Sequence, residues 1–241
     1  MIIKAGNMTF KELNGKIRES GDNTVLIEEC SGQRYIAAGL KNASVTINGT
    51  PGNALGAYLD GAVITVNGNA QDATGDTMND GEIVIYGSSG DATGYAMRGG
   101  KILVQGNAGY RAGIHMKAYK EKQPKLVIGG SAGCFLGEYQ AGGIIVVLGI
   151  GCDEDKAPVG SFCGTGMHGG KMFIRSNVPP KGLPEQVSCR EASDEDKSEI
   201  SVLIDEFCHH FGYEPQKIKA SKFFVLVPDT NNPYKRLYTA N

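Results

Sequence analysis

The chain has 241 residues, a formal net charge of -2 and 35 glycines. This glycine content is about twice the average but has no three-residue period, which excludes collagen, and the charge leaves no basic footprint for nucleic acid. The six cysteines form no C-x-x-C pair, so they fit a reduced compartment better than a disulfide framework or a zinc site. The N-terminus lacks an apolar signal core, and the longest apolar run is too short to cross a bilayer. We expect a soluble cytoplasmic protein without nucleic-acid or membrane partners.

Residues 1–31 are interpreted as an N-terminal lead-in. Within it, residues 11–20 are compatible with a short helix or turn, and residues 24–27 predict a strand. Gly32 and Gly39 then stand seven residues apart, ahead of the strand-like residues 45–47. This segment is an imperfect first copy of the repeat that follows.

From Gly49 onward the sequence repeats with a period of nineteen residues. Each unit opens on a glycine, carries another glycine seven residues later and closes on a short β-branched run. The two glycine sets are Gly49, Gly68, Gly87, Gly106, Gly130 and Gly56, Gly75, Gly94, Gly113, Gly137. The closing runs, at 63–66, 83–86, 102–104, 126–128 and 144–148, predict strands because glycines bracket them.

A unit this small cannot bury a core alone, but stacked units present each strand to the next at the ordinary spacing of ~4.8 Å. Two further sets recur: an alanine set expected in a narrow interior and a methionine set expected as a core ladder. They are Ala54, Ala73, Ala92 and Met78, Met97, Met116. We therefore predict an all-β fold, a right-handed single-stranded parallel β-helix of about seven coils over residues 32–176.

Two insertions interrupt the repeat, at 117–125 and 150–163, and insertions in solenoids map to loops that often form contact faces. Residues 177–241 are expected to hold a linker, a capping helix and a tail. Ser193 to Asp196 predicts a capping box that opens the helix, and Gly212 predicts its end. The helix and an extended segment at 223–227 are expected to pack on the terminal coil and cover its unpaired edge.

Asp72 and Asp91 occupy the same position of consecutive units, above Asn53, and are the only residues singled out as a site. Two stacked carboxylates can share a proton or bind a cation. Alternatively, each carboxylate accepts hydrogen bonds from turn amides, as Asp commonly does. We predict no catalytic and no cofactor-binding residue on the chain, and no metal site beyond these two candidates.

An enzyme of the carbohydrate-acting β-helix class would need carboxylates and basic groups clustered on its strands. Lys101, Lys125 and Lys171 flank the predicted strands, and we expect them to lack acidic partners in register. His115 and His168 lie in turns at unrelated positions, without partners at metal-ligand spacing. The glycines match no phosphate-binding motif in a strand-turn-helix context.

The glycine motifs taken together resemble a known family. They are Gly32-Gln-Arg-Tyr, Gly49-Thr-Pro-Gly-Asn, Gly68-Asn-Ala, Gly106-Asn-Ala-Gly and the glycine-bounded apolar run 142–149. This register is similar to the G-x-G-x-G domain at the C-terminal end of the glutamate synthase large chain, over roughly residues 9–176. The closing helix and residues 223–228 also resemble the end of that chain. The repeat is similar, too, to the non-catalytic β-helix component of formylmethanofuran dehydrogenase.

The resemblance implies a non-catalytic subunit of a split glutamate synthase, an oxidoreductase complex that forms glutamate from glutamine and 2-oxoglutarate. The chain would brace an amidotransferase and a synthase subunit, and FMN and iron–sulfur clusters would reside on these partners. A scaffold of formylmethanofuran dehydrogenase and a carbohydrate-acting enzyme remain the alternatives. A homo-oligomer is left open. The insertion 117–125 and the tail 234–238 are predicted partner contacts because they mix basic and aromatic residues.

Overall fold

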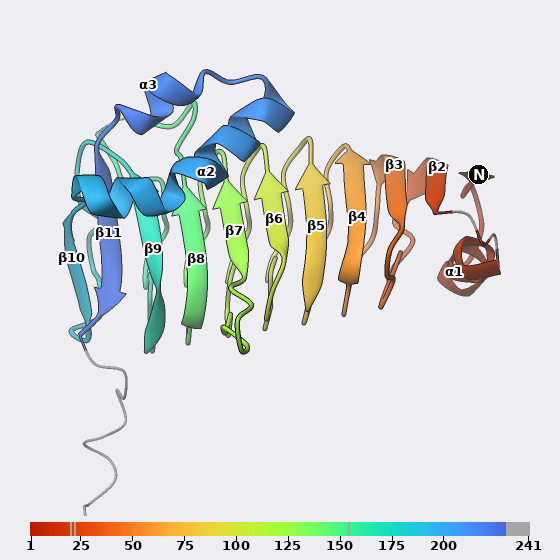
Figure 1. Ribbon diagram of the computed structural model, residues 1–241, viewed down its shortest axis with the longest axis horizontal. Helices are drawn as coiled ribbons and strands as arrows, with labels where there is room; N and C mark the ends of the chain where they lie inside the picture. The colour runs from red at the N-terminus through yellow and green to blue at the C-terminus, as the bar shows by residue number, and fades with distance from the viewer. Residues whose placement is uncertain (20, 22, 154, 230–241) are drawn as a thin grey trace, which may run out of the picture.

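The computed structural model describes residues 1–19, 21, 23–153 and 155–229. These residues form one mostly parallel sheet of eleven strands, with three helices (Figure 1). The strands are β1 Ile2–Lys4, β2 Thr24–Ser31, β3 Ser44–Thr50, β4 Asp60–Asn67, β5 Asp80–Ile85, β6 Lys101–Val104, β7 Lys125–Ile128, β8 Ala141–Val147, β9 Gly169–Arg175, β10 Val187–Glu191 and β11 Phe223–Pro228. The helices are α1 Phe10–Glu19, α2 Asp194–Phe211 and α3 Pro215–Lys219.

Strands β1 to β9 stand side by side in chain order and pair in parallel, and β11 and β10 extend the same sheet antiparallel. The predicted all-β class and the predicted repeat strands are confirmed. Strand β5 pairs with β6 at an offset of nineteen residues, as between Ile83 and Ile102. The domain limits set at residues 31 and 176 stay predictions, and the sheet continues across both of them.

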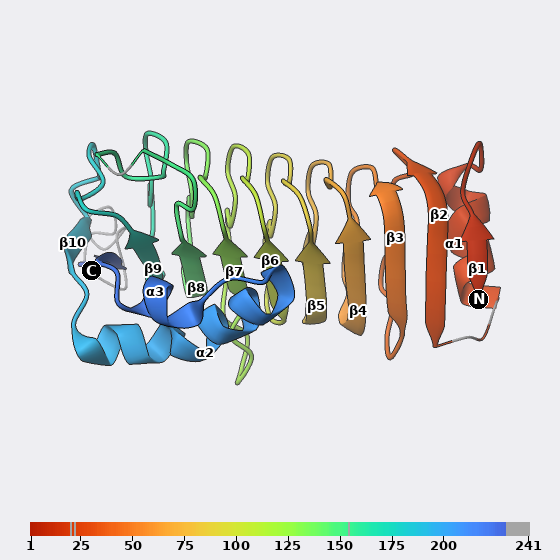
Figure 2. The same cartoon turned by 90° about the horizontal axis from the view of Figure 1, so that it is seen from above.

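The segments between the strands also pair with their counterparts in the next unit. The Ala54 N–H donates to the Asp72 carbonyl at 2.9 Å, and the Gly75 N–H donates to the Leu55 carbonyl at 2.8 Å. These turns lie on the side of the molecule opposite α2 and α3 (Figure 2). Backbone hydrogen bonds therefore link neighbouring units on the turn side as well as on the sheet side.

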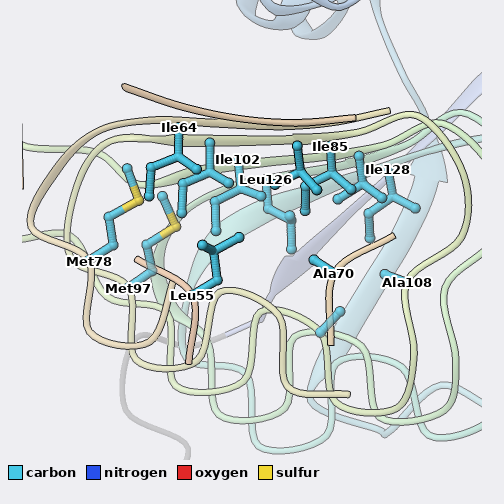
Figure 3. Packing of buried hydrophobic residues seen from close by; sticks show 14 of the residues in the cluster. Leu55, Ile64, Ala70, Met78, Ile85, Met97, Ile102, Ala108, Leu126 and Ile128 are labelled. Carbon is cyan, nitrogen blue, oxygen red and sulfur yellow. The ribbon is translucent and has the colours of Figure 1, made fainter. Parts of the chain in front are cut away.

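The main core lies between the sheet and the turns. Ile102 and Leu126 project inward from their strands, while Met78 and Met97 lie one above the other at the turn end of the interior (Figure 3). The predicted methionine ladder is confirmed, because all three of its members are fully buried. The alanine set is only partly inside: Ala54 is buried, but Ala73 and Ala92 are only half-buried, and later units carry large side chains such as Phe162 at this position.

A second core lies on the outer face of the sheet, under α2. Alternate strand residues point outward, and from β5 to β9 one register row of them is apolar. The members of this row are Val84, Leu103, Val127, Val146 and Phe173. Helix α2 packs on them with Ile200, Leu203 and Phe207. Helix α2 thus covers the outer face of the sheet. The edge of the terminal coil, which the helix and the extended segment were predicted to cover, is covered by β11, which pairs with β9.

The two ends of the structure are closed in different ways. At the N-terminal end, α1 places Leu13 and Ile17 into the main core, which continues the interior beyond the first unit. At the other end, β11 pairs with β9 and β10 forms the outer edge. Strands β1 and β10 and helix α3 had no sequence prediction, and the predicted tail contact at 234–238 falls outside the described residues.

Helix α2 begins with the predicted capping box. Ser193 accepts a hydrogen bond from the Asp196 N–H, and Asp196 accepts one from the Ser193 N–H at 2.8 Å. Arg190 of β10 pairs with the same carboxylate, whose side chain is 6% exposed. Arg190 and the Ser193 donors hold the pKa of Asp196 well below its usual range. The predicted end of the helix is confirmed, since Gly212 adopts a left-handed φ of 73°.

Replacing Asp196 by Asn is expected to lower the free energy of unfolding at pH 7 by about 1–3 kcal/mol, because it removes a charged hydrogen-bond acceptor. The depressed pKa stabilises the fold above the unfolded pKa, so the deficit should narrow as pH falls below about 4. Urea unfolding at several pH values measures this. Asp194→Asn, exposed in the same helical turn, should cost less than about 1 kcal/mol. Equal losses for both variants would contradict the assignment.

Because the units stack closely, replacing one glycine by alanine should destabilise the fold far more than the same change at its counterpart in the preceding unit. Gly61 and Gly81 have similar φ angles of 106° and 103°. A Cβ on Gly81 would lie 2.2 Å from the Ala62 carbonyl oxygen, whereas one on Gly61 would meet nothing nearer than 3.8 Å. Gly61→Ala should therefore cost only backbone strain, about 1–3 kcal/mol. Gly81→Ala should cost at least about 2 kcal/mol more, measured by urea unfolding, since a backbone atom must move.

Candidate functional site

Asp72 and Asp91 lie in successive turns on the surface, and both carboxylates accept hydrogen bonds from the next unit. The Asp91 N–H donates to Asp72 Oδ1 at 2.9 Å, and the Tyr110 N–H donates to Asp91 Oδ1 at 2.8 Å. Gly90 leaves the room that this needs, because a Cβ there would lie 2.2 Å from Asp72 Oδ1. The geometry matches the turn-amide interpretation. No group of three or more His, Cys, Asp or Glu side chains suited to a metal ion occurs within the described part of the chain.

A cluster of charged side chains lies where β5 and β6 meet α2. Lys101 Nζ is 3.2 Å from Glu82 Oε2 and 2.9 Å from Glu206 Oε2. His210 Nε2 is 2.9 Å from Glu82 Oε1. Glu82 and Lys101 are register partners on adjacent strands, so the expectation that Lys101 lacks an acidic partner in register is wrong. The pair could have been predicted, because Glu82 and Lys101 are nineteen residues apart and so occupy equivalent positions of the repeat. Glu206 and His210 come from α2, whose position no local pattern predicts.

The ion pairs around Lys101 decide what this cluster can do chemically. Burial lowers the pKa of Lys101, but the hydrogen bonds and charges of Glu206 and Glu82 outweigh that effect and raise it. A lysine with a raised pKa stays protonated at neutral pH and cannot act as a general base. Lys171 has no acidic partner in register, as expected, since its strand partner is Ile144, but it pairs with Glu199 of α2 at 2.5 Å. Both lysines attach α2 to the sheet.

The insertion at 117–125 forms a small hairpin that turns back onto earlier units. Tyr119 and Lys122 exchange two backbone hydrogen bonds of 3.0 Å. Lys122 Nζ reaches Asp80 Oδ2 at 2.8 Å, and each residue shifts the other's pKa toward the charged form. Tyr119 stays exposed. A groove of about 410 Å³ separates this hairpin from the Lys101 cluster.

The second insertion, 150–163, helps to line an open cleft of about 770 Å³ at the end of β9. Arg175 lies at its wall, held by a 2.9 Å hydrogen bond from Nε to Ser221 Oγ and a 2.6 Å bond from Nη1 to the Leu148 carbonyl. Lys156 and Lys217 also line the cleft, but each pairs with a nearby carboxylate. Arg175 therefore links Leu148, just ahead of the insertion, to Ser221, just after α3, while the two lysines pair locally.

Burial disfavours the reactive thiolate form of Cys30 and Cys163. All six cysteines are free. Burial raises the pKa of Cys30 to about 11, despite the opposing contact with Gln33, and raises the pKa of Cys163 to about 12. A nucleophilic cysteine needs a lowered pKa, so neither of these two thiols is poised for attack at neutral pH.

The Lys101 cluster is expected to act as a structural clamp. Lys101→Met should lower the free energy of unfolding by about 1–3 kcal/mol, because it leaves two half-buried carboxylates without their cation. A raised pKa stabilises the fold below the unfolded pKa, so this deficit should shrink only as pH rises beyond about 10.4. Denaturant unfolding between pH 7 and 11 measures it. Lys125→Met, the next position of the same register, is the control; equal stability of the two variants would refute the clamp.

Among the described residues, none of the helices combines the length and the apolar composition that a membrane crossing requires. The chain is 46% identical over 253 residues to the uncharacterized protein MJ1350 of Methanocaldococcus jannaschii, a match that covers 99% of this chain and 96% of that protein. The model of the GXGXG motif family matches residues 14–228, which include α2 and β11 as well as the repeats. The chain therefore belongs to the GXGXG motif family, the family of the glutamate synthase C-terminal domain.

Proposed function

We propose that the sheet and its turns form a right-handed single-stranded parallel β-helix that serves as a non-catalytic subunit of a split glutamate synthase. In this assembly the chain braces an amidotransferase subunit and a synthase subunit that carries FMN and iron–sulfur clusters. The complex works in the cytoplasm and uses glutamine to convert 2-oxoglutarate to glutamate. The observation that carries the proposal is the family match across residues 14–228.

The extent of the relative supports a free-standing subunit. The protein from Methanocaldococcus jannaschii aligns over 96% of its own length, so it consists almost wholly of the same region. A chain built this way needs partners to take part in glutamate synthesis. We therefore place the catalytic cysteine, the flavin and the clusters on other subunits.

The chemistry of the described surface also favours a brace. The charged groups that most resemble an enzyme site, Glu82, Lys101 and Glu206, pair with one another while they hold α2. The stacked carboxylates of Asp72 and Asp91 bind turn amides. Each of these polar groups already performs a structural task.

Co-expression tests this function. A tagged form of the chain should co-purify with amidotransferase-type and FMN-type synthase subunits from the same genome, as one flavin-coloured species on size exclusion. The complex should form glutamate from glutamine and 2-oxoglutarate, whereas the isolated chain should be colourless and show no glutaminase activity. Removal of the chain should reduce the yield of the complex, because the two catalytic subunits lose their brace.

Two outcomes would reject the proposal. One is retention of molybdenum- or tungsten-containing subunits in place of the flavin subunit, which would favour the formylmethanofuran dehydrogenase alternative. The other is glutaminase activity or bound flavin in the isolated chain. Deletion of 118–123 within the complex separately tests whether the hairpin contacts a partner.

A further inference from the structure

Aromatic residues in the turns of the later units contact one another from unit to unit. These turns lie on the side of the molecule opposite α2 (Figure 2). We call this surface the aromatic face. It consists of Tyr95, Tyr110, His115, Phe135, Tyr139 and Phe162. None of these side chains takes part in the charged cluster, the two insertion contacts described above or the carboxylate contacts of the stacked aspartates.

The first row of the aromatic face runs along three successive units. The ring centroids of Tyr110 and Phe135 are 5.4 Å apart, and those of Phe135 and Phe162 are 4.8 Å apart in a stacked arrangement. Phe162 nevertheless remains 55% exposed. Tyr110 meets Phe135 edge-on, whereas Phe135 and Phe162 stack, so the row is a continuous series of ring contacts.

The second row runs beside the first. His115 packs edge-on against Tyr95 at 5.9 Å and stacks on Tyr139 at 5.2 Å. Arg111 connects the rows, because its guanidinium lies 4.8 Å from the Tyr110 ring and its Nε is 2.7 Å from Glu138 Oε2. The side chain of Glu138 is only 8% exposed. The two rows therefore form one surface with an internally neutralised charge.

The backbone beneath these rings is unfavourable for large side chains. Phe135, Tyr139 and Phe162 have left-handed φ angles of 60°, 54° and 61°. Small residues, Ala92 and Ala96, occupy the equivalent positions of an earlier unit with the same conformation. Large side chains at left-handed φ carry backbone strain that the contacts between the rings must offset, and Phe162 also exposes apolar area to water.

We propose that the aromatic face is the docking surface for a partner subunit, which meets it with an uncharged apolar patch. Glu138 balances the charge of Arg111, so this pair adds no net charge to the aromatic face, and the one carboxylate described beside the rings, Asp91, already accepts a hydrogen bond from the Tyr110 N–H. Tyr, Phe and Arg at the centre of such a patch are residue types that are enriched at interfaces, and Tyr and Arg often dominate the binding energy. This inference rests on the proposed function, which supplies the partner.

The test uses the full chain co-expressed with the amidotransferase-type and synthase-type subunits. The double variant Phe135→Asn/Phe162→Asn should bind one of them at least about tenfold more weakly, as measured by titration of the purified subunits. Its thermal midpoint should be unchanged or higher, since Asn accepts left-handed backbone. Tyr58→Asn is the matched control, because Tyr58 is 58% exposed with a φ of 57° but lies outside the aromatic face.

Each of the following results would overturn the proposal that the aromatic face is the docking surface. If the double variant binds both subunits as tightly as the natural chain, the proposed function stands and the aromatic face is not the contact. If the natural chain binds neither subunit, the proposed function and the docking surface fail together. If sedimentation shows a homo-oligomer that only the double variant dissociates, while subunit binding is unchanged, the occupant is a second copy of the chain.

Discussion

Pairing of backbone between equivalent residues of neighbouring units is the constraint on which the structure depends. The Gly75 N–H, for example, donates to the Leu55 carbonyl of the unit before it. Strand β5, which follows Gly75 in the same unit, pairs with β6 of the unit after it. Each unit must therefore follow the same trace as the last. This explains why left-handed φ recurs at Ala54, Gly56 and Tyr58 and again one period later. Where the trace leaves no room for a side chain, as at Gly81, only glycine satisfies it.

Within that trace the side chains that point outward are free to vary, and their variation divides the surface into regions. On the sheet side, Thr46 and Thr65 stand at paired outward positions of β3 and β4, outside the outer core that α2 covers. Val84 and its register partners on the following strands, as far as Phe173 of β9, are apolar and lie under α2. Tyr86 marks the transition, because it is partly exposed and donates its hydroxyl to the His210 carbonyl at the end of the helix. The outer core therefore extends over only those strands that α2 covers.

The same constraint explains what could be predicted from the sequence. A period of nineteen residues, glycines seven apart and β-branched runs predict the strands and the parallel register because they are local and repeated. The capping box at Ser193 and the end at Gly212 are local as well. The position of α2 on the flank was missed because it depends on outward residues of five strands at once. The ion pairs of Lys101 were missed with it, since Glu206 approaches only when the helix is in place.

The alanine set shows how a correct period can still mislead. Ala73 and Ala92 recur at a position where the backbone has a left-handed φ in successive units. Recurrence alone does not distinguish an inward position from an outward one. The later occupants of the same position, Phe135 and Phe162, resolve the question, because rings of that size cannot enter so narrow a core. The later units thus display rings on the turn flank, while α2 covers the opposite flank, and it is on the turn flank that we propose a partner docks.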